Sequence, residues 1–237
     1  LSDSRRLARL LGAVVITVSA AVFLARDSWR AECVPLVLFG MTLAIVNRRE
    51  LAFVLSLAAA LVIALSLGQG LFELMVLTAT VSAPVIMLNR VRSRTKLIYV
   101  GLYGAAITFV AVMGVGVLAD QTFGSVHVAG LSPSGEEEVL AEGGFAAKLV
   151  SGAGWHAACV ILAGFIMTGL LPFTERLFDV QTDISLLELG DAAHPLLQEL
   201  ARRAPGTYNH SINVATLAET AAERIGANGL LVRVGAY

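Results

Sequence analysis

His210 is the residue of this chain whose surroundings point most directly to chemistry. It stands in the run 205–215, PGTYNHSINVA, which follows Ala204 and opens on a helix-breaking Pro-Gly pair. A neutral imidazole is the side chain that most often binds a transition metal in proteins. The residue could therefore be one ligand of a metal site, although a single histidine on an apolar helical stripe is more often a satisfied core residue than a ligand.

The helix that must position His210 is predicted to start near Thr207, run to Ile225 and stop at Gly226. One stripe at helical period contains His210, Val214, Leu217, Ala218, Ala221 and Ile225. We therefore expect His210 to share a buried face. Three shorter helices are predicted around it: one over 185–189, one from about 194 to 203 with Asp191 as a possible cap, and one that is entered from Asn228 and continues to the last residue.

Four more reactive side chains lie within apolar segments. Glu73 follows a Gly-Gln-Gly turn and His156 follows an interfacial tryptophan, so both are expected near a membrane surface rather than in a proton relay. Cys33 and Cys159 lack the short paired spacings of a zinc site or a disulfide framework. We interpret both cysteines as packing residues.

The composition places these residues in a membrane protein. Of the 237 residues, 57% are hydrophobic and 15% are charged, whereas soluble domains average roughly 45–50% apolar and about 25% charged residues. The formal net charge of −1 excludes a dispersed basic surface, so no nucleic-acid polymer is expected as a partner. The predicted class is a polytopic membrane protein, with the lipid bilayer as its surroundings.

Six segments are long and apolar enough to be candidate spans. They cover residues 7–25, 33–46, 51–67, 71–88, 97–119 and 149–173. The second is short and would suit a buried or re-entrant segment, but extension back through Trp29 gives a full crossing. Small residues in the fifth segment predict close packing against a neighbour: Gly101, Gly104, Ala105, Gly114 and Gly116.

The distribution of basic residues predicts the orientation. Nine of them fall at the termini and connections on one side, namely Arg5, Arg6, Arg9, Arg48, Arg49, Arg90, Arg92, Arg94 and Lys96, whereas Arg26, Arg30 and Lys148 lie on the other side. Basic loops are retained in the cytoplasm. The N-terminus and the tail are therefore expected in the cytoplasm, and the acidic connection 120–148 is expected outside as a solvated loop.

Several stretches of the chain together resemble a known family. They are the run 205–215 with its continuations 217–219, 225–228 and 234–237, the pair LEL 187–189 and HPLL 194–197, and the junction LLPFTERLF 170–178. The tail is similar to the opening of an HD-domain phosphohydrolase. More narrowly, the chain resembles the seven-transmembrane HD family of bacterial cyclic-di-AMP phosphodiesterases.

This resemblance implies an all-α fold, in which a polytopic membrane helical bundle of about six spans precedes the first helices of an all-α HD domain. The implied organisation is a membrane region 1–174, a cytoplasmic junction 175–184 and a truncated HD domain 185–237. His210 matches the family's first metal ligand, and the implied cofactor is a pair of divalent transition metal ions, Mn or Fe. No other catalytic and no cofactor-binding residue is assigned, because the His-Asp pair of the family is expected just beyond Tyr237. The fragment by itself is expected to be inactive.

The implied function is hydrolysis of a cyclic dinucleotide, cyclic di-AMP, by a multi-pass protein of the bacterial inner membrane, under control of an external ligand that binds an extracellular domain missing here. Two alternatives stay open. A noncatalytic membrane receptor with a degenerate HD domain would keep the helices but lack the His-Asp pair. A transporter with a regulatory tail would need polar groups at mid-membrane depth, and apart from Glu73 and His156 the spans offer almost none. The oligomeric state is left open.

Overall fold

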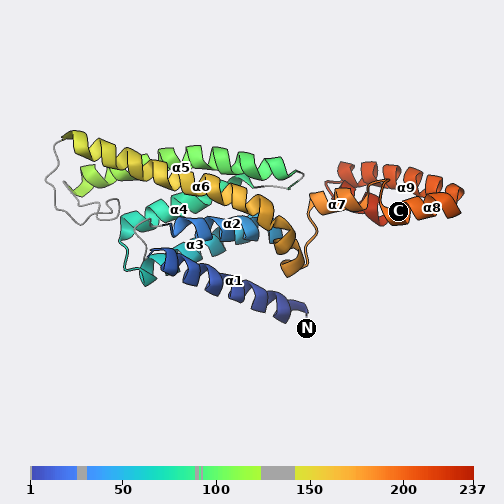
Figure 1. The fold of residues 1–237 in the computed structure, drawn as a ribbon, viewed down its shortest axis with the longest axis horizontal. Helices are drawn as coiled ribbons and strands as arrows, with labels where there is room; N and C mark the ends of the chain where they lie inside the picture. Colours follow the sequence, from blue (N-terminus) through green and yellow to red (C-terminus); the bar gives the residue numbers. More distant parts are fainter. Residues whose placement is uncertain (1, 26–30, 89–90, 92, 124–141) are drawn as a thin grey trace. The chain divides into compact units, whose positions relative to one another are not determined.

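The structure, a computed structural model, describes residues 2–25, 31–88, 91, 93–123 and 142–237, and all regular structure in these residues is helical (Figure 1). The described helices are α1 Ser2–Ala25, α2 Cys33–Val46, α3 Arg49–Ser66, α4 Leu71–Met87, α5 Arg94–Phe123, α6 Glu142–Phe178, α7 Asp183–Leu189, α8 Pro195–Arg203, α9 Pro205–Arg224 and α10 Gly229–Gly235. The predicted all-α class is confirmed for this part of the chain.

The helices form two compact units, which are described separately. The membrane unit comprises Leu1–Asn89 and Thr95–Phe178, and therefore contains almost all of α1 to α6. The tail unit comprises Asp179–Tyr237, with α7 to α10, together with the connection Arg90–Arg94.

Each of the six expected spans coincides with one helix of the membrane unit. Within the described residues, four helices are long and apolar enough to cross a bilayer, in the segments Leu7–Ala25, Arg49–Ser66, Arg94–Leu118 and Ala146–Phe178. The two shorter apolar helices are α2 and α4. The 14 residues of α2 extend over about 21 Å, less than the roughly 30 Å hydrocarbon core. The predicted extension of this span through Trp29 lies outside the described residues.

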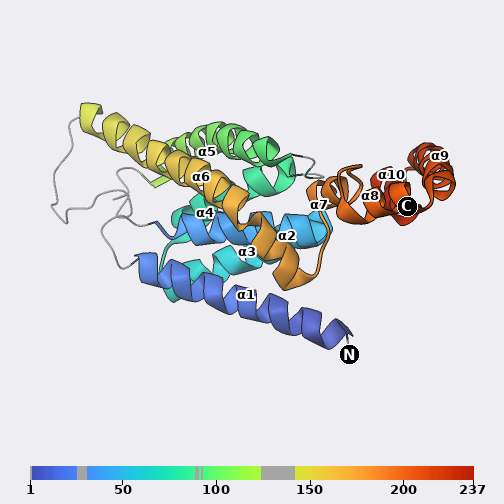
Figure 2. The ribbon, with the colours of Figure 1, turned by 45° about the vertical axis from the view of Figure 1, so that its right-hand side comes forward.

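Helix α2 is the centre of the membrane unit. It contacts α1, α3, α4 and α6, and these helices surround it in both ribbon views (Figures 1 and 2). Most of its residues are buried, and it has apolar side chains all round rather than on one stripe. A helix of this kind is stable only when other helices cover it. The short second span is therefore a core helix rather than a lipid-facing one.

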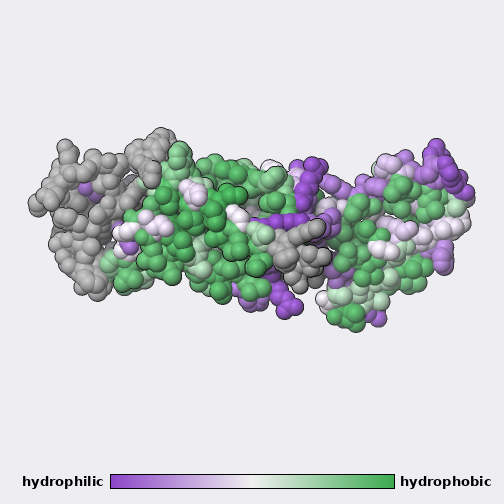
Figure 3. Space-filling view, turned by 90° about the horizontal axis from the view of Figure 1, so that it is seen from below, coloured by the Kyte–Doolittle hydropathy of each residue, from purple (hydrophilic) through white to green (hydrophobic). Residues whose placement is uncertain are grey.

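Many of the hydrophobic side chains lie exposed on the outer faces of this unit. Only 11% of the apolar stretch of α1 is buried within the protein, and large apolar side chains such as Ile16 and Phe23 are exposed. Hydrophobic residues also cover most of the coloured membrane-unit surface in view in Figure 3. In water such a surface would be unstable, whereas a bilayer covers it. The structure thus supports a multi-pass membrane protein.

Glycines permit close contact between α5 and its neighbours, as expected. A Cβ on Gly101 would lie 3.1 Å from the Cα of Gly164 in α6, and one on Gly104 would lie 3.3 Å from the Pro84 ring in α4. Gly116 similarly faces the side chain of Leu149. The expectation is wrong for Gly114, because a Cβ at that position would have no neighbour within 4 Å.

The helices flanking the predicted external loop are longer than expected. Helix α5 continues to Phe123 and α6 begins at Glu142, so the predicted loop 120–148 includes two helical ends. The acidic run 136–138 lies outside the described residues. Helix α6 also continues through Pro172 to Phe178, past residue 173, where the sixth span is predicted to end. The apolar segments are shorter than these helices because helical hydrogen bonding continues into the flanking polar sequence.

Candidate metal centre

The helix that carries His210 begins and ends where its sequence requires. Pro205 occupies the first turn of α9, where its missing N–H is not needed and its fixed φ suits the helix. The chain leaves the helix at Ile225 and turns at Gly226, whose φ of 74° is accessible mainly to glycine. The predicted stop at Gly226 is confirmed, and the start lies two residues before the predicted Thr207.

The predicted burial of His210 is wrong for the described chain. His210 is exposed, and so is its stripe apart from the half-buried Ala218, with Leu217 at 74% and Ile225 at 82% exposure. The buried face of α9 instead centres on Ala215 and Ala222, and this face packs against α8 and α10. Both faces satisfy a helical period, and the alanines allow closer approach of neighbouring helices. The periodicity therefore identified a real apolar stripe but not the side of α9 that its neighbours cover.

The neighbouring helices of the tail unit correct two further predictions. The residue that caps α8 is His194, whose Nδ1 accepts a hydrogen bond from the Leu196 N–H at 3.4 Å. Asp191 instead accepts from the Ala193 N–H within the preceding turn. Asn228 caps α10 through the Leu231 N–H, as its position predicts. However, α10 ends at Gly235, so the prediction that the last helix includes Tyr237 is wrong.

A charged network fastens α10 to the buried side of α9. Arg233 donates from Nε to the Tyr237 hydroxyl at 2.7 Å and pairs through a second nitrogen with Glu219 of α9 at 3.3 Å. The hydrogen bond with Tyr237, assisted by Glu219, raises the pKa of the Arg233 guanidinium above its usual value. The network thus links α10 to α9, the helix that presents His210.

The described residues do not complete a metal site. Throughout the part of the chain that the structure describes, no three histidine, cysteine, aspartate or glutamate side chains lie close enough to hold a metal ion. His210 fits the role of a single ligand, because its imidazole is accessible on a regular helix. A catalytic metal centre needs at least three protein ligands in most cases. The other ligands would have to come from outside the described residues.

The two ionisable candidates of the membrane unit lie at different places. Glu73 is half-buried in the first turn of α4, where the helix dipole favours a negative charge. His156 is half-buried in α6, in the turn that precedes Cys159. The structure thus places the two side chains on different helices, α4 and α6.

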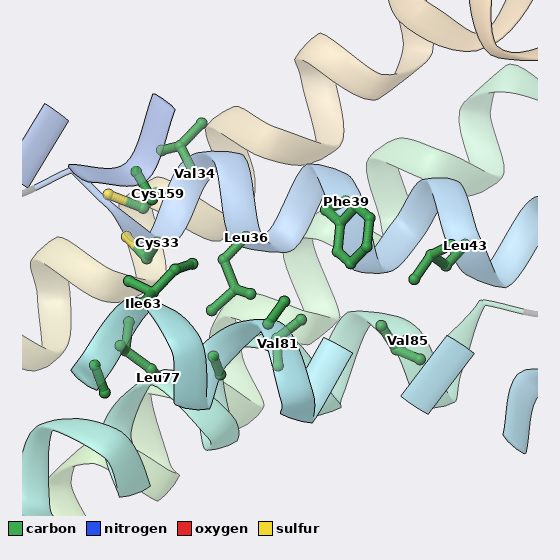
Figure 4. Packing of buried hydrophobic residues seen from close by; sticks show 14 of the residues in the cluster. Cys33, Val34, Leu36, Phe39, Leu43, Ile63, Leu77, Val81, Val85 and Cys159 are labelled. Carbon is green, nitrogen blue, oxygen red and sulfur yellow. The ribbon is translucent and has the colours of Figure 1, made fainter. Parts of the chain in front are cut away.

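A polar cluster that the sequence reasoning missed lies at the start of α2. Glu32 is only 5% exposed, and its Oε1 accepts a hydrogen bond of 3.2 Å from the Gln69 amide in the turn between α3 and α4. Its Oε2 is buried without a hydrogen-bond partner. Cys33 follows Glu32 directly in the chain, and Cys33 and Cys159 belong to the same buried cluster of the membrane unit (Figure 4). The only sequence signal was a glutamate directly before an apolar run.

Comparison with known proteins identifies relatives of most of this chain. The family model described as "7TM receptor with intracellular HD hydrolase" matches residues 3–182. The chain is 34% identical over 153 residues to "Cyclic-di-AMP phosphodiesterase PgpH" of Bacillus subtilis (strain 168), a match that covers 65% of this chain and 19% of that protein. It is 51% identical over 69 residues to the protein of the same name from Listeria monocytogenes serotype 1/2a (strain 10403S), covering 29% of this chain and 10% of that protein.

A third relative is "Uncharacterized protein slr0104" of Synechocystis sp. (strain ATCC 27184 / PCC 6803 / Kazusa), 52% identical over 67 residues, which are 28% of this chain and 8% of that protein. No solved structure matches the chain. The chain spans a fifth or less of the length of these curated relatives.

Proposed function

Because the chain belongs to the family of 7TM receptors with an intracellular HD hydrolase, we propose that it forms the membrane region and the first hydrolase helices of a metal-dependent phosphodiesterase. The observation that carries the proposal is the family match through α1 to α6, followed on the same chain by the HD-like run 205–215 in α9. The proposed substrate is a cyclic dinucleotide, cyclic di-AMP, because two relatives are named for that activity. The proposed location is the bacterial inner membrane, with the N-terminus and tail in the cytoplasm, under control of an external ligand.

We propose that His210 is one metal ligand of this hydrolase. The exposed stripe of His210, Val214, Leu217 and Ile225 supports this role, since apolar side chains on a helix are stable when a further layer covers them. In the complete protein that layer would be the remainder of the HD domain, which would also supply the other ligands. His210 would then lie at the junction of the two parts, where a shared metal site can form.

The contribution of this chain to hydrolysis is positional. A bound pair of Mn or Fe ions would supply an acidified water and neutralise charge that develops on the phosphoryl group. Helix α9 would hold the His210 imidazole in a fixed direction, and the Arg233–Glu219 pair would keep α9 in place against α10. A ligand on a helix whose position is fixed by its neighbours needs little rearrangement when a metal binds.

The experiment compares purified full-length protein with its His210→Ala and Thr216→Ala variants. Thr216 is the matched control, because it is exposed on the same helix and its hydroxyl donates to the Ile212 carbonyl one turn earlier at 2.9 Å, within α9. We measure bound metal per polypeptide by elemental mass spectrometry and the hydrolysis of cyclic di-AMP. His210→Ala should lower the metal content and reduce hydrolysis by at least about 10-fold, whereas Thr216→Ala should change neither.

Two results would count against this function. An unchanged metal content in His210→Ala would return His210 to the role of an ordinary surface residue. Wild-type protein that binds metal but hydrolyses no cyclic dinucleotide would refute the enzymatic proposal and favour a noncatalytic receptor.

A further inference from the structure

The two cysteines of the chain lie in one buried cluster of the membrane unit. Cys33 is the first residue of α2 and Cys159 lies within α6; they are 0% and 3% exposed. Their sulfur atoms lie close together at one end of the cluster shown in Figure 4. The fold thus places two thiols that are far apart in the sequence side by side.

The helices that carry the thiols are aligned over a long distance. Thr42 of α2 contacts the Met167 sulfur of α6 at 3.9 Å. Thr42 is nine residues after Cys33 and Met167 is eight residues after Cys159, so the two helices run in the same direction at nearly the same spacing. A covalent bond between the thiols therefore requires side-chain rotation and a small approach of the helices rather than sliding of one helix along the other.

A buried hydrogen-bond acceptor belongs to the residue directly before Cys33 in the chain. Oε1 of Glu32 accepts a hydrogen bond from Gln69, whereas its Oε2 is buried without a hydrogen-bond partner. A buried acceptor without a donor is costly and favours a small molecule that donates an O–H group. A peroxide has two such groups and an O–O bond that thiols reduce.

We propose that Cys33 and Cys159 are a redox modification site, at which a peroxide converts the two thiols into a disulfide that fastens α2 to α6. In the first step one thiol sulfur attacks a peroxide oxygen, the O–O bond breaks, and the products are a sulfenic acid and one water. In the second step the other thiol attacks the sulfenic sulfur, the S–S bond forms, and the sulfenic oxygen leaves as a second water. Two thiols and one hydrogen peroxide thus give one disulfide and two waters.

The disulfide would act on the helix that leads to the tail. Helix α6 continues to Phe178, where the membrane unit ends. A covalent bond at Cys159 would restrict any movement of α6 relative to the central helix α2. The modification itself does not depend on the proposed hydrolase, so its test reads the bond directly.

The test uses the 237-residue chain in detergent micelles, treated with hydrogen peroxide and then denatured in the presence of an alkylating maleimide. The chain has only two cysteines, so the intact mass reports every outcome. We expect both alkylation sites to disappear together and the monomer mass to fall by about 2 Da, with full recovery after reduction. The matched controls Cys33→Ser and Cys159→Ser should form no disulfide within the monomer.

Other outcomes would overturn the proposal. If both cysteines are still alkylated after peroxide treatment, the thiols have not reacted and serve only to pack the core. Separate addition of oxygen atoms to each cysteine, or a disulfide only between two chains, would mean that the contact is not a disulfide site. If a serine variant fails to fold, wild-type protein still decides the question, because its monomer either loses both thiols together or does not.

Discussion

The contact between Gly101 of α5 and Gly164 of α6 allows a sharp test of the membrane packing, through the substitution Gly164→Ala. A Cβ at position 164 would lie 2.9 Å from the Gly101 Cα, 3.3 Å from the Leu97 carbonyl oxygen and 3.4 Å from the Gly101 nitrogen. All three neighbours are backbone atoms of α5, so no side-chain rotation can relieve the contact. The helices must move apart instead.

The size of the effect follows from this geometry. Carbon atoms pack at about 3.5–4.0 Å, so the 2.9 Å contact requires a separation of about 0.6 Å or more between two rigid backbones. Overpacking of this kind costs about 1–3 kcal/mol. Replacing a helical glycine by alanine also lowers the backbone entropy cost, which contributes up to about 1 kcal/mol in the opposite direction.

A second substitution on the same helix removes the entropy contribution from the comparison. Gly169 of α6 is exposed and has nothing within 4 Å of a Cβ, so Gly169→Ala changes backbone entropy without a clash. The difference between Gly164→Ala and Gly169→Ala should therefore equal the packing cost of about 1–3 kcal/mol. For a chain of this size, that difference lowers the melting temperature by about 2–12 °C.

The buried cysteines provide the assay. A fluorogenic thiol reagent reacts with Cys33 and Cys159 only when the membrane unit opens, because both are buried in its core. Melting curves of the detergent-solubilised variants then give the two temperatures under identical conditions. If Gly164→Ala melts at the same temperature as Gly169→Ala, α5 and α6 do not meet through these glycines and the packing argument is wrong.

Two predictions concern the tail unit. Asn228→Ala removes the acceptor of the Leu231 N–H at the start of α10 and should destabilise the unit by about 0.5–2 kcal/mol, measured as a lower denaturant midpoint, whereas Asn228→Asp keeps an acceptor and should retain most of the stability. Tyr237→Phe removes the 2.7 Å hydrogen bond from Arg233 and should cost about 0.5–1.5 kcal/mol, with the Glu219 pair left in place. Because the folded-state pKa of Arg233 is raised, its contribution is complete below the unfolded-state pKa and is lost only as the pH rises through the folded value, far above neutrality. The Tyr237→Phe effect should therefore be the same at about pH 6 and about pH 9, both far below the ordinary pKa of arginine, and a cost that changes between them would show that another group titrates with it.

Most boundaries of the tail helices could be predicted from local sequence signals. Pro205, Gly226 and Asn228 mark helix boundaries through backbone constraints that act within a few residues. The exposure of His210 could not be predicted, because α9 has two apolar stripes and the packing of α8 and α10 decides which one is buried. The cap of α8 was not predictable either, because Asp191 and His194 both precede the helix and both carry a hydrogen-bond acceptor. The structure shows that His194 caps the helix, whereas Asp191 stabilises the preceding turn.

What the sequence alone determined is the class of the protein: six apolar helices, a membrane environment and a polar helical tail, because hydropathy and helix signals are local properties of the chain. Only the tertiary structure decided that the shortest apolar segment, α2, is the core helix, that Gly101 meets Gly164, and that Cys33 and Cys159 share one buried cluster. These contacts join residues far apart in the chain, and each depends on which faces of the helices pack together. A helix that is apolar on every side has no hydropathy pattern from which its contact faces could be predicted.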